Sequence, residues 1–74
     1  MLVTIEKLTE LPDARHPHNI EVGYTHTGKF INPPEIGERF YVGPTWSTSP
    51  VMEIISDTVF KTLNSIYKIT LHNV

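Results

Sequence analysis

Proline and glycine are spaced so closely along this chain that they leave little room for a long helix. Six prolines and four glycines occur in 74 residues, and β-branched and aromatic residues fill many of the intervals between them. Proline and glycine interrupt helices, whereas β-branched and aromatic side chains suit the half-buried surface of a sheet. The chain is therefore expected to be all-β, with at most a single helical turn near residues 12–15.

Strands are predicted where polar and apolar residues alternate between these interruptions. The first is "LVTIEKL", in which Val3 and Ile5 share one face. A second is expected over "IEVGYTHTG", where Gly23 would mark a bulge or a close approach of backbones. A third is expected over residues 38–42.

The last third of the chain has the clearest strand pattern. "PVMEII" predicts a strand, "SDT" a tight turn and "VFKTL" the returning strand, and "SIYKITL" predicts a final strand with Tyr67, Ile69 and Leu71 on one face. The segments "TELPDARHPHN" and "GPTWSTSP" are expected to be connections. About five short strands at this spacing favour one small barrel, of the SH3-like or OB-like kind, as a single domain over residues 1–74.

The small size of the chain limits its core. A domain of this length buries only about 60% of its unfolded surface, and such scaffolds usually need a disulfide, a metal, oligomerisation or very good packing. The sequence has no cysteine, which excludes disulfides and thiolate zinc sites and leaves self-association open. No stretch has the length of a membrane span, and "MLVTIEKLTE" lacks the signal-peptide pattern, so a soluble protein of the cytoplasm is expected.

The charge pattern disfavours a nucleic-acid partner. Six lysine and arginine residues against eight aspartate and glutamate residues give a net charge of −2, and the charges are scattered. Proteins that hold a nucleic-acid backbone normally carry a basic patch or stripe. Only folding could gather one here, from Lys29, Arg39, Lys61 and Lys68.

Two polar pairs, Thr48-Ser49 and Asn64-Ser65, flank the predicted hairpin at its open end. A turn centred near Asp57 would place three pairs of hairpin residues opposite each other: Ile54 and Phe60, Met52 and Thr62, and Pro50 and Asn64. Thr48 and Ser49 are then expected beside Asn64 and Ser65, although the two pairs are far apart in the sequence.

Two interpretations of this polar cluster stay open. In the first, the side chains satisfy backbone groups where the chain leaves the sheet, with each bond contributing about 0.5–1.5 kcal/mol. In the second, they form a polar floor for a ligand beside Tyr41, Trp46 and Tyr67.

The segment "TSPVMEI…FKTLNSIYKI" resembles the C-terminal pattern of short proteins encoded by bacteriophages and prophages, most of which have no assigned function. The matching positions are Thr48, Ser49, Val51, Ile54, Phe60, Thr62, Asn64, Ser65 and Tyr67. The resemblance covers about the last third of the chain, with weaker support from "GERFYV". It implies an accessory protein of a mobile element, acting in a bacterial host, and it implies no particular chemistry.

No pattern in the chain points to a cofactor or to catalysis. The "HPH" segment supplies His16 and His18, which with Asp13 could begin a zinc site, but no standard ligand spacing completes it. No nucleophile elbow or phosphate-binding glycine loop is present, and a barrel of this size is filled largely by its own side chains. We therefore expect no metal, no cofactor and no catalytic residues.

The favoured function is a non-enzymatic module that binds a host or phage protein, for example as an inhibitor of a host enzyme or defence system. The candidate contact residues are Tyr41, Trp46, Thr48, Asn64 and Tyr67. Tyrosine and tryptophan are common at interface hot spots, although Trp46 in its loop could instead cap the barrel.

Two alternatives remain. One is a barrel that stacks single-stranded bases on Trp46 and Tyr41 and contacts phosphates through Lys29, Arg39 and Lys61. The other is a structural subunit that self-associates through a strand edge.

Overall fold

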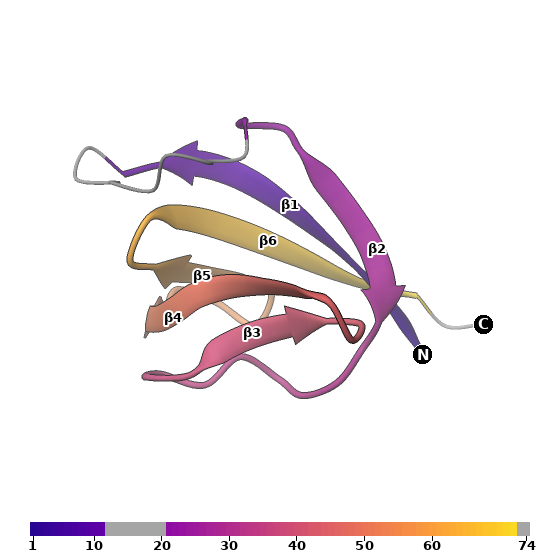
Figure 1. Cartoon of the computed structure of the whole chain (residues 1–74). Coiled ribbons are helices and arrows are strands. Elements are labelled where there is room, and N and C mark those ends of the chain that lie inside the picture. Colours follow the sequence, from indigo (N-terminus) through magenta and orange to yellow (C-terminus); the bar gives the residue numbers. More distant parts are fainter. Residues whose placement is uncertain (12–20, 73–74) are drawn as a thin grey trace.

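The residues that the structure describes form six antiparallel β-strands, which make a nearly closed barrel (Figure 1). The structure is a computed structural model and describes residues 1–11 and 21–72. The strands are β1 (Leu2–Glu10), β2 (Thr25–Lys29), β3 (Arg39–Val42), β4 (Trp46–Ile54), β5 (Val59–Thr62) and β6 (Ser65–His72). The all-β prediction is confirmed, with six strands among the described residues in place of about five. No described residue belongs to a helix that is long and apolar enough to cross a membrane. The helical turn predicted near residues 12–15 lies outside the described residues.

The first and last strands lie side by side within the sheet, whose order is β2-β1-β6-β5-β4-β3. β1 pairs with β6 along nearly its whole length, from Leu2 opposite His72 to Glu10 opposite Ser65. The long connection between the two halves of the sheet runs from β2 to β3, and these two strands are also the edges that approach each other.

The barrel closes where β2 meets β3. Phe30 forms a single bridge with Val42, and the Gly43 N–H donates to the Lys29 carbonyl at 2.9 Å. A Cβ atom on Gly28 would lie 3.0 Å from the Val42 Cγ1 atom, which is closer than nearly all carbon contacts of this kind. Glycine at position 28 therefore lets the two edges come together.

The core consists of the side chains that point inward from the strands. Its members are Val3, Ile5, Phe40, Val42, Val51, Phe60, Tyr67 and Ile69. The predicted inward face of the first strand is thereby confirmed. Leu71 shares the face of Tyr67 and Ile69 by alternation and lies opposite the core residue Val3, but it is 50% exposed.

The prediction that Gly23 lies inside the second strand is wrong. Gly23 has a φ of 94°, in the left-handed region that glycine adopts without steric cost, and its N–H donates to the Lys7 carbonyl at 2.8 Å. Gly23 therefore turns the chain toward β1 before the strand begins at Thr25.

The prediction of a connection over "GPTWSTSP" is wrong beyond residue 45, because β4 begins at Trp46 and runs through Pro50. β4 pairs with β3 up to Pro50 and with β5 from Val51 onward. Pro50 therefore lies where the strand changes partner, and there its missing N–H interrupts neither ladder.

The predicted hairpin register is correct at one end only. Ile54 lies opposite Phe60, as predicted, but Thr62 lies opposite Val51 instead of Met52. An irregularity between Val51 and Glu53 shifts the register by one residue, as a β-bulge does.

Candidate functional site

The first predicted polar pair satisfies the backbone between β3 and β4. Thr48 is only 2% exposed, and its Oγ1 atom accepts from the Phe40 N–H at 3.1 Å and donates to the Ser49 carbonyl at 2.7 Å. No hydrogen bond within the described residues joins this pair to Asn64 or Ser65. The Thr48 side chain is thus part of the interior and not of an exposed contact surface.

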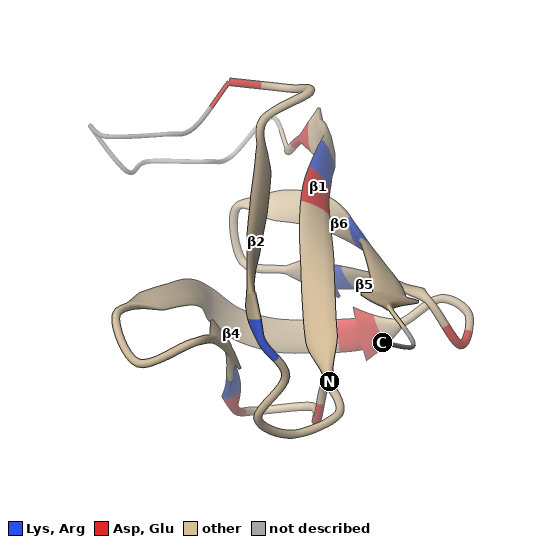
Figure 2. Cartoon of the chain, turned by 90° about the vertical axis from the view of Figure 1, so that its right-hand side faces the viewer, with Lys and Arg blue, Asp and Glu red and all other residues tan. Residues whose placement is uncertain are grey.

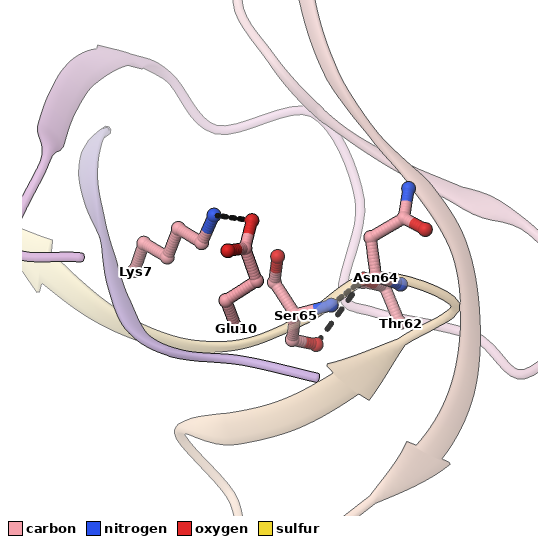
Figure 3. Close-up of polar contacts among 5 residues, drawn as sticks. All are labelled: Lys7, Glu10, Thr62, Asn64 and Ser65. Atoms are coloured by element: carbon pink, nitrogen blue, oxygen red, sulfur yellow. Dashed lines mark hydrogen bonds and ion pairs between the residues drawn. The ribbon is translucent and has the colours of Figure 1, made fainter. Parts of the chain in front are cut away.

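The second polar pair closes the turn between β5 and β6 (Figure 3). The buried Thr62 Oγ1 accepts from the N–H groups of Asn64 at 3.3 Å and Ser65 at 3.1 Å, and it donates to the Ser65 carbonyl at 3.2 Å. The Asn64 carbonyl accepts from the Leu11 N–H at 2.9 Å. These bonds favour the structural interpretation of the polar cluster over a ligand floor.

A buried lysine, which was not predicted as a site residue, lies beside this turn. The Lys7 side chain is 1% exposed, and its Nζ atom donates to Glu10 Oε1 at 3.2 Å (Figure 3). The alternation that places Val3 and Ile5 inside the barrel continues to Lys7, so the signal was present in the sequence. Lys7 is buried, whereas the side chain of its partner Glu10 is 42% exposed. A buried charge needs such a partner, so this contact is expected to matter for folding more than for binding.

Tyr67, opposite Lys7 across the β1–β6 ladder, is also interior. Burial raises the pKa of the Tyr67 hydroxyl above its usual value of 10.0; its hydrogen bond with Ser65 lowers the pKa and the charge of Glu10 raises it. Tyr67 is therefore a core residue with a hydrogen-bonded hydroxyl and is not available to a partner at the surface.

Trp46 joins three parts of the barrel wall. Its ring stacks on His26 at a centroid distance of 5.5 Å and on Tyr24 at 6.5 Å, and it meets the Tyr67 ring edge-on at 6.1 Å. The half-buried indole packs against the core. It connects β4 to His26 of β2, although these two strands are not paired in the sheet. This placement favours the capping interpretation of Trp46.

Tyr41 and Trp46 do not share a surface. Val42 lies opposite Trp46 in the β3–β4 ladder and is buried, whereas the preceding residue, Tyr41, is 48% exposed. Successive residues of a strand point to opposite faces, so Tyr41 faces away from the core that Trp46 contacts. Of the five predicted contact residues, Tyr41 is the one with a largely exposed side chain; Asn64 and Trp46 are half-buried.

A hollow of about 290 Å³ lies beside β3 and includes Tyr41. We call it the β3 hollow, and it is lined by Ile31, Asn32, Pro33, Glu35, Glu38, Arg39 and Tyr41. Of these residues, only Tyr41 and Arg39 were predicted as site candidates, and Arg39 was predicted only as a phosphate contact.

The β3 hollow forms because the chain leaves the edge of β3 after the bridge at Phe30. Continued antiparallel pairing would bring Ile31 opposite Tyr41, but Pro33 and Pro34 have no N–H to donate to a ladder. The segment therefore departs from β3. It rejoins the sheet at Gly37, whose N–H donates to the carbonyl of Val51 in β4 at 2.7 Å. The Pro33-Pro34 pair indicates a loop in the sequence, but the distance of that loop from β3 was not predictable.

The lining of the β3 hollow has an apolar and a charged part. Ile31 is 43% exposed and, with Pro33 and the Tyr41 ring, provides apolar surface. Arg39 Nη1 donates to the Thr48 carbonyl at 3.1 Å. In the part of the chain that the structure describes, the one ion pair within 4.0 Å is that of Lys7 and Glu10, so neither Glu35 nor Glu38 is paired.

Basic residues elsewhere on the barrel are interleaved with acidic ones. Lys68 lies opposite Glu6 across β6 and β1, and Lys61 lies opposite Glu53 across β5 and β4. Figure 2 shows the same alternation of lysine and arginine with aspartate and glutamate over the side of the molecule that it presents. The described residues therefore offer no continuous basic stripe for a phosphate backbone.

The described residues contain no group of three or more histidine, aspartate or glutamate side chains placed to hold a metal ion. The candidate ligands Asp13, His16 and His18 lie outside them. Comparison of the chain with models of protein families, with curated proteins and with solved structures gives no significant match.

Proposed function

We propose that this chain is a non-enzymatic accessory protein of a bacteriophage or similar element, which binds a host or phage protein through the β3 hollow. The observation that carries the proposal is the exposed Tyr41 side chain in a hollow that also contains Ile31 and Arg39. Tyrosine and arginine are enriched among the residues that dominate binding energies at protein interfaces. The attribution to a mobile element rests on the sequence resemblance alone.

The size of the β3 hollow suits a partner's side chain better than a cofactor. Its volume of about 290 Å³ is just below the range of about 300–1,000 Å³ that is usual for small-molecule pockets. Two of its lining residues, Arg39 and Tyr41, lie on β3, and a strand of the barrel limits the ordering cost of association for these two side chains. A small protein docked in this way acts by covering its partner's surface, and inhibition of a host enzyme or defence system is one form of that action.

Self-association is a second candidate function, favoured by a separate observation. Ile36 and Met52 are more than half exposed, and the bridge between Ile36 and Val51 brings them into the same region of the surface. A second copy of the chain would remove both side chains from water. A molar mass that rises with protein concentration, measured by sedimentation equilibrium, would favour this alternative.

The test of the main proposal is an affinity capture from nuclease-treated bacterial lysate. The captured proteins are quantified by mass spectrometry for the wild type, for Tyr41→Ala and for Leu63→Ala. Leu63 is a matched control because its side chain is 51% exposed and lies in the β5–β6 turn, outside the β3 hollow. Trp46→Ala is less suitable, because it removes a ring that packs against the core.

The expected result is one protein recovered in near-equal amount by the wild type and Leu63→Ala, and reduced by about tenfold or more with Tyr41→Ala, as for a hot-spot residue. Equal recovery by all three proteins would contradict the placement of the site. Loss of every partner on nuclease treatment would favour the nucleic-acid alternative.

A further inference from the structure

The charges of the β3 hollow are unbalanced in favour of carboxylates. Glu35 and Glu38 contribute two negative charges, and Arg39 contributes one positive charge. The Arg39 guanidinium donates through Nη1 to the Thr48 carbonyl, and it forms no ion pair within 4.0 Å with either glutamate. A basic group that enters the hollow therefore finds two carboxylates that are not already bound to a cation.

The apolar lining of the hollow complements the stem of a long basic side chain. Lysine and arginine cover apolar surface with their methylene groups while the charged end reaches polar partners. Ile31 and Pro33 provide such surface, and the exposed ring of Tyr41 provides a face on which a cation is stabilised. A short or purely apolar side chain would use one part of the lining and leave the carboxylates without a partner.

We infer that the β3 hollow receives a basic side chain of the partner protein, and that this side chain is an arginine. A guanidinium group is planar, bonds to carboxylates through two parallel N–H donors and stacks on aromatic rings, whereas an ammonium group is a compact, strongly hydrated charge. The inference rests on the proposed function and specifies the chemistry of the partner at the same site.

An acidic partner group fits the hollow less well. Arg39 would be its sole basic contact, and that side chain already donates one hydrogen bond to β4. The carboxylates of Glu35 and Glu38 would repel it. The chain as a whole carries a net charge of −2, which adds a weak long-range preference for a basic partner surface.

The inference is tested by titrating the ¹⁵N-labelled full chain with four capped amino acids and following the amide signals by NMR. The probes are the N-acetyl, N-methylamide derivatives of arginine, lysine, norleucine and glutamate. We expect the arginine probe to shift the amides of residues 31–32 and 35–41 progressively. We expect the lysine and norleucine probes to bind more weakly at the same place and the glutamate probe to cause no shift there.

Charge-neutralising variants provide the decisive comparison. Glu35→Gln combined with Glu38→Gln should weaken binding of the arginine probe about three- to tenfold, as expected for exposed ion pairs. Glu6→Gln combined with Glu53→Gln changes the net charge equally at positions opposite Lys68 and Lys61, outside the hollow, and should leave the affinity unchanged.

Three outcomes would overturn the inference: shifts spread evenly over the acidic residues of the barrel, equal affinities of the arginine and norleucine probes, or equal affinities of the two double variants. A lysine probe that binds as tightly as the arginine probe would overturn the choice of arginine. These results are distinguishable from failure of the proposed function. If lysate capture depends on Tyr41 but is unchanged by the Glu35/Glu38 double variant, the docking site stands and the basic partner group is wrong.

Discussion

At the scale of single residues, the Thr62 hydroxyl has the clearest structural role. It serves two backbone donors and one backbone acceptor in the turn between β5 and β6, and it is fully buried. Thr62→Val keeps the shape and removes these bonds, so the free energy of unfolding should fall by about 1–3 kcal/mol. Urea denaturation would measure this change, with the exposed Thr70→Val as the control, for which a change within about 0.5 kcal/mol is expected. Equal losses in the two variants would contradict the role of Thr62.

The Tyr67 hydroxyl should make stability depend on pH in the alkaline range. Its pKa is raised in the folded state, chiefly by burial, so the folded protein holds this proton more tightly than the unfolded chain does. The corresponding stabilisation is fully present below the unfolded value of 10.0 and is lost as pH rises through the folded pKa. Denaturation midpoints measured from pH 8 upward should fall less steeply for Tyr67→Phe than for the wild type. Parallel curves would show that Tyr67 does not titrate differently on folding.

At the scale of elements, the approach of β2 to β3 depends on the absence of a side chain at Gly28. Gly28→Val would place carbon atoms against the Val42 side chain, where even a Cβ atom lies at 3.0 Å. We expect a loss of about 1–3 kcal/mol, as for overpacked sites, and faster hydrogen exchange of the Gly43 N–H that donates to Lys29. The control is Thr25→Val, at an exposed position of the same strand. Unchanged exchange at Gly43 in Gly28→Val would mean that the closure adapts without opening.

The strands were predictable where their pattern is local, and the errors arise where the partner strand decides. Alternation alone located the inward face of β1, with Val3 and Ile5. Pro50 was predicted to be the first residue of a strand. The sequence does not show that β4 exchanges β3 for β5 as its pairing partner at this point, where a proline can lie within the strand. The register between Val51 and Glu53 was missed for the same reason, since a bulge depends on the opposing strand.

The candidate site was predicted less well than the fold. Tyr41 was identified, and it does line a hollow, but Thr48 and Tyr67 proved to be interior. The face of Tyr67 was predictable, because alternation along the last strand places it with Ile69. The face of Thr48 was not, because residues 43–50 were expected to be a connection. The glutamates of the β3 hollow were not predictable, because their proximity to Tyr41 depends on the path of the loop after Phe30.

At the scale of the whole molecule, Trp46 connects segments that are not paired with one another by strands. Trp46 belongs to β4. Its contacts with Tyr24 and His26 connect β4 to β2 and the residue before it, and its contact with Tyr67 connects β4 to β6. Trp46→Ala should lower the free energy of unfolding by about 3 kcal/mol, the low end for tryptophan because the ring is half-buried. For a domain of this size, that loss corresponds to a fall in Tm of more than about 10 °C.

Scanning calorimetry would measure the Trp46 effect, with Trp46→Phe as a partial replacement that retains an aromatic ring. We expect the phenylalanine variant to lose clearly less stability than the alanine variant. Equal melting temperatures for Trp46→Ala and the wild type would show that the stacked rings are not coupled to the fold.

The pairing of β1 with β6 also has a consequence for synthesis on the ribosome. β6 is the last of the six strands to be translated, and until it emerges β1 lacks its central neighbour. Until β6 is available, Val3 and Ile5 have no complete core to enter, so the nascent chain exposes apolar side chains and unpaired backbone. The barrel is therefore expected to complete its folding only after β6 has left the ribosome, and a chaperone that holds the early strands would protect them during that interval.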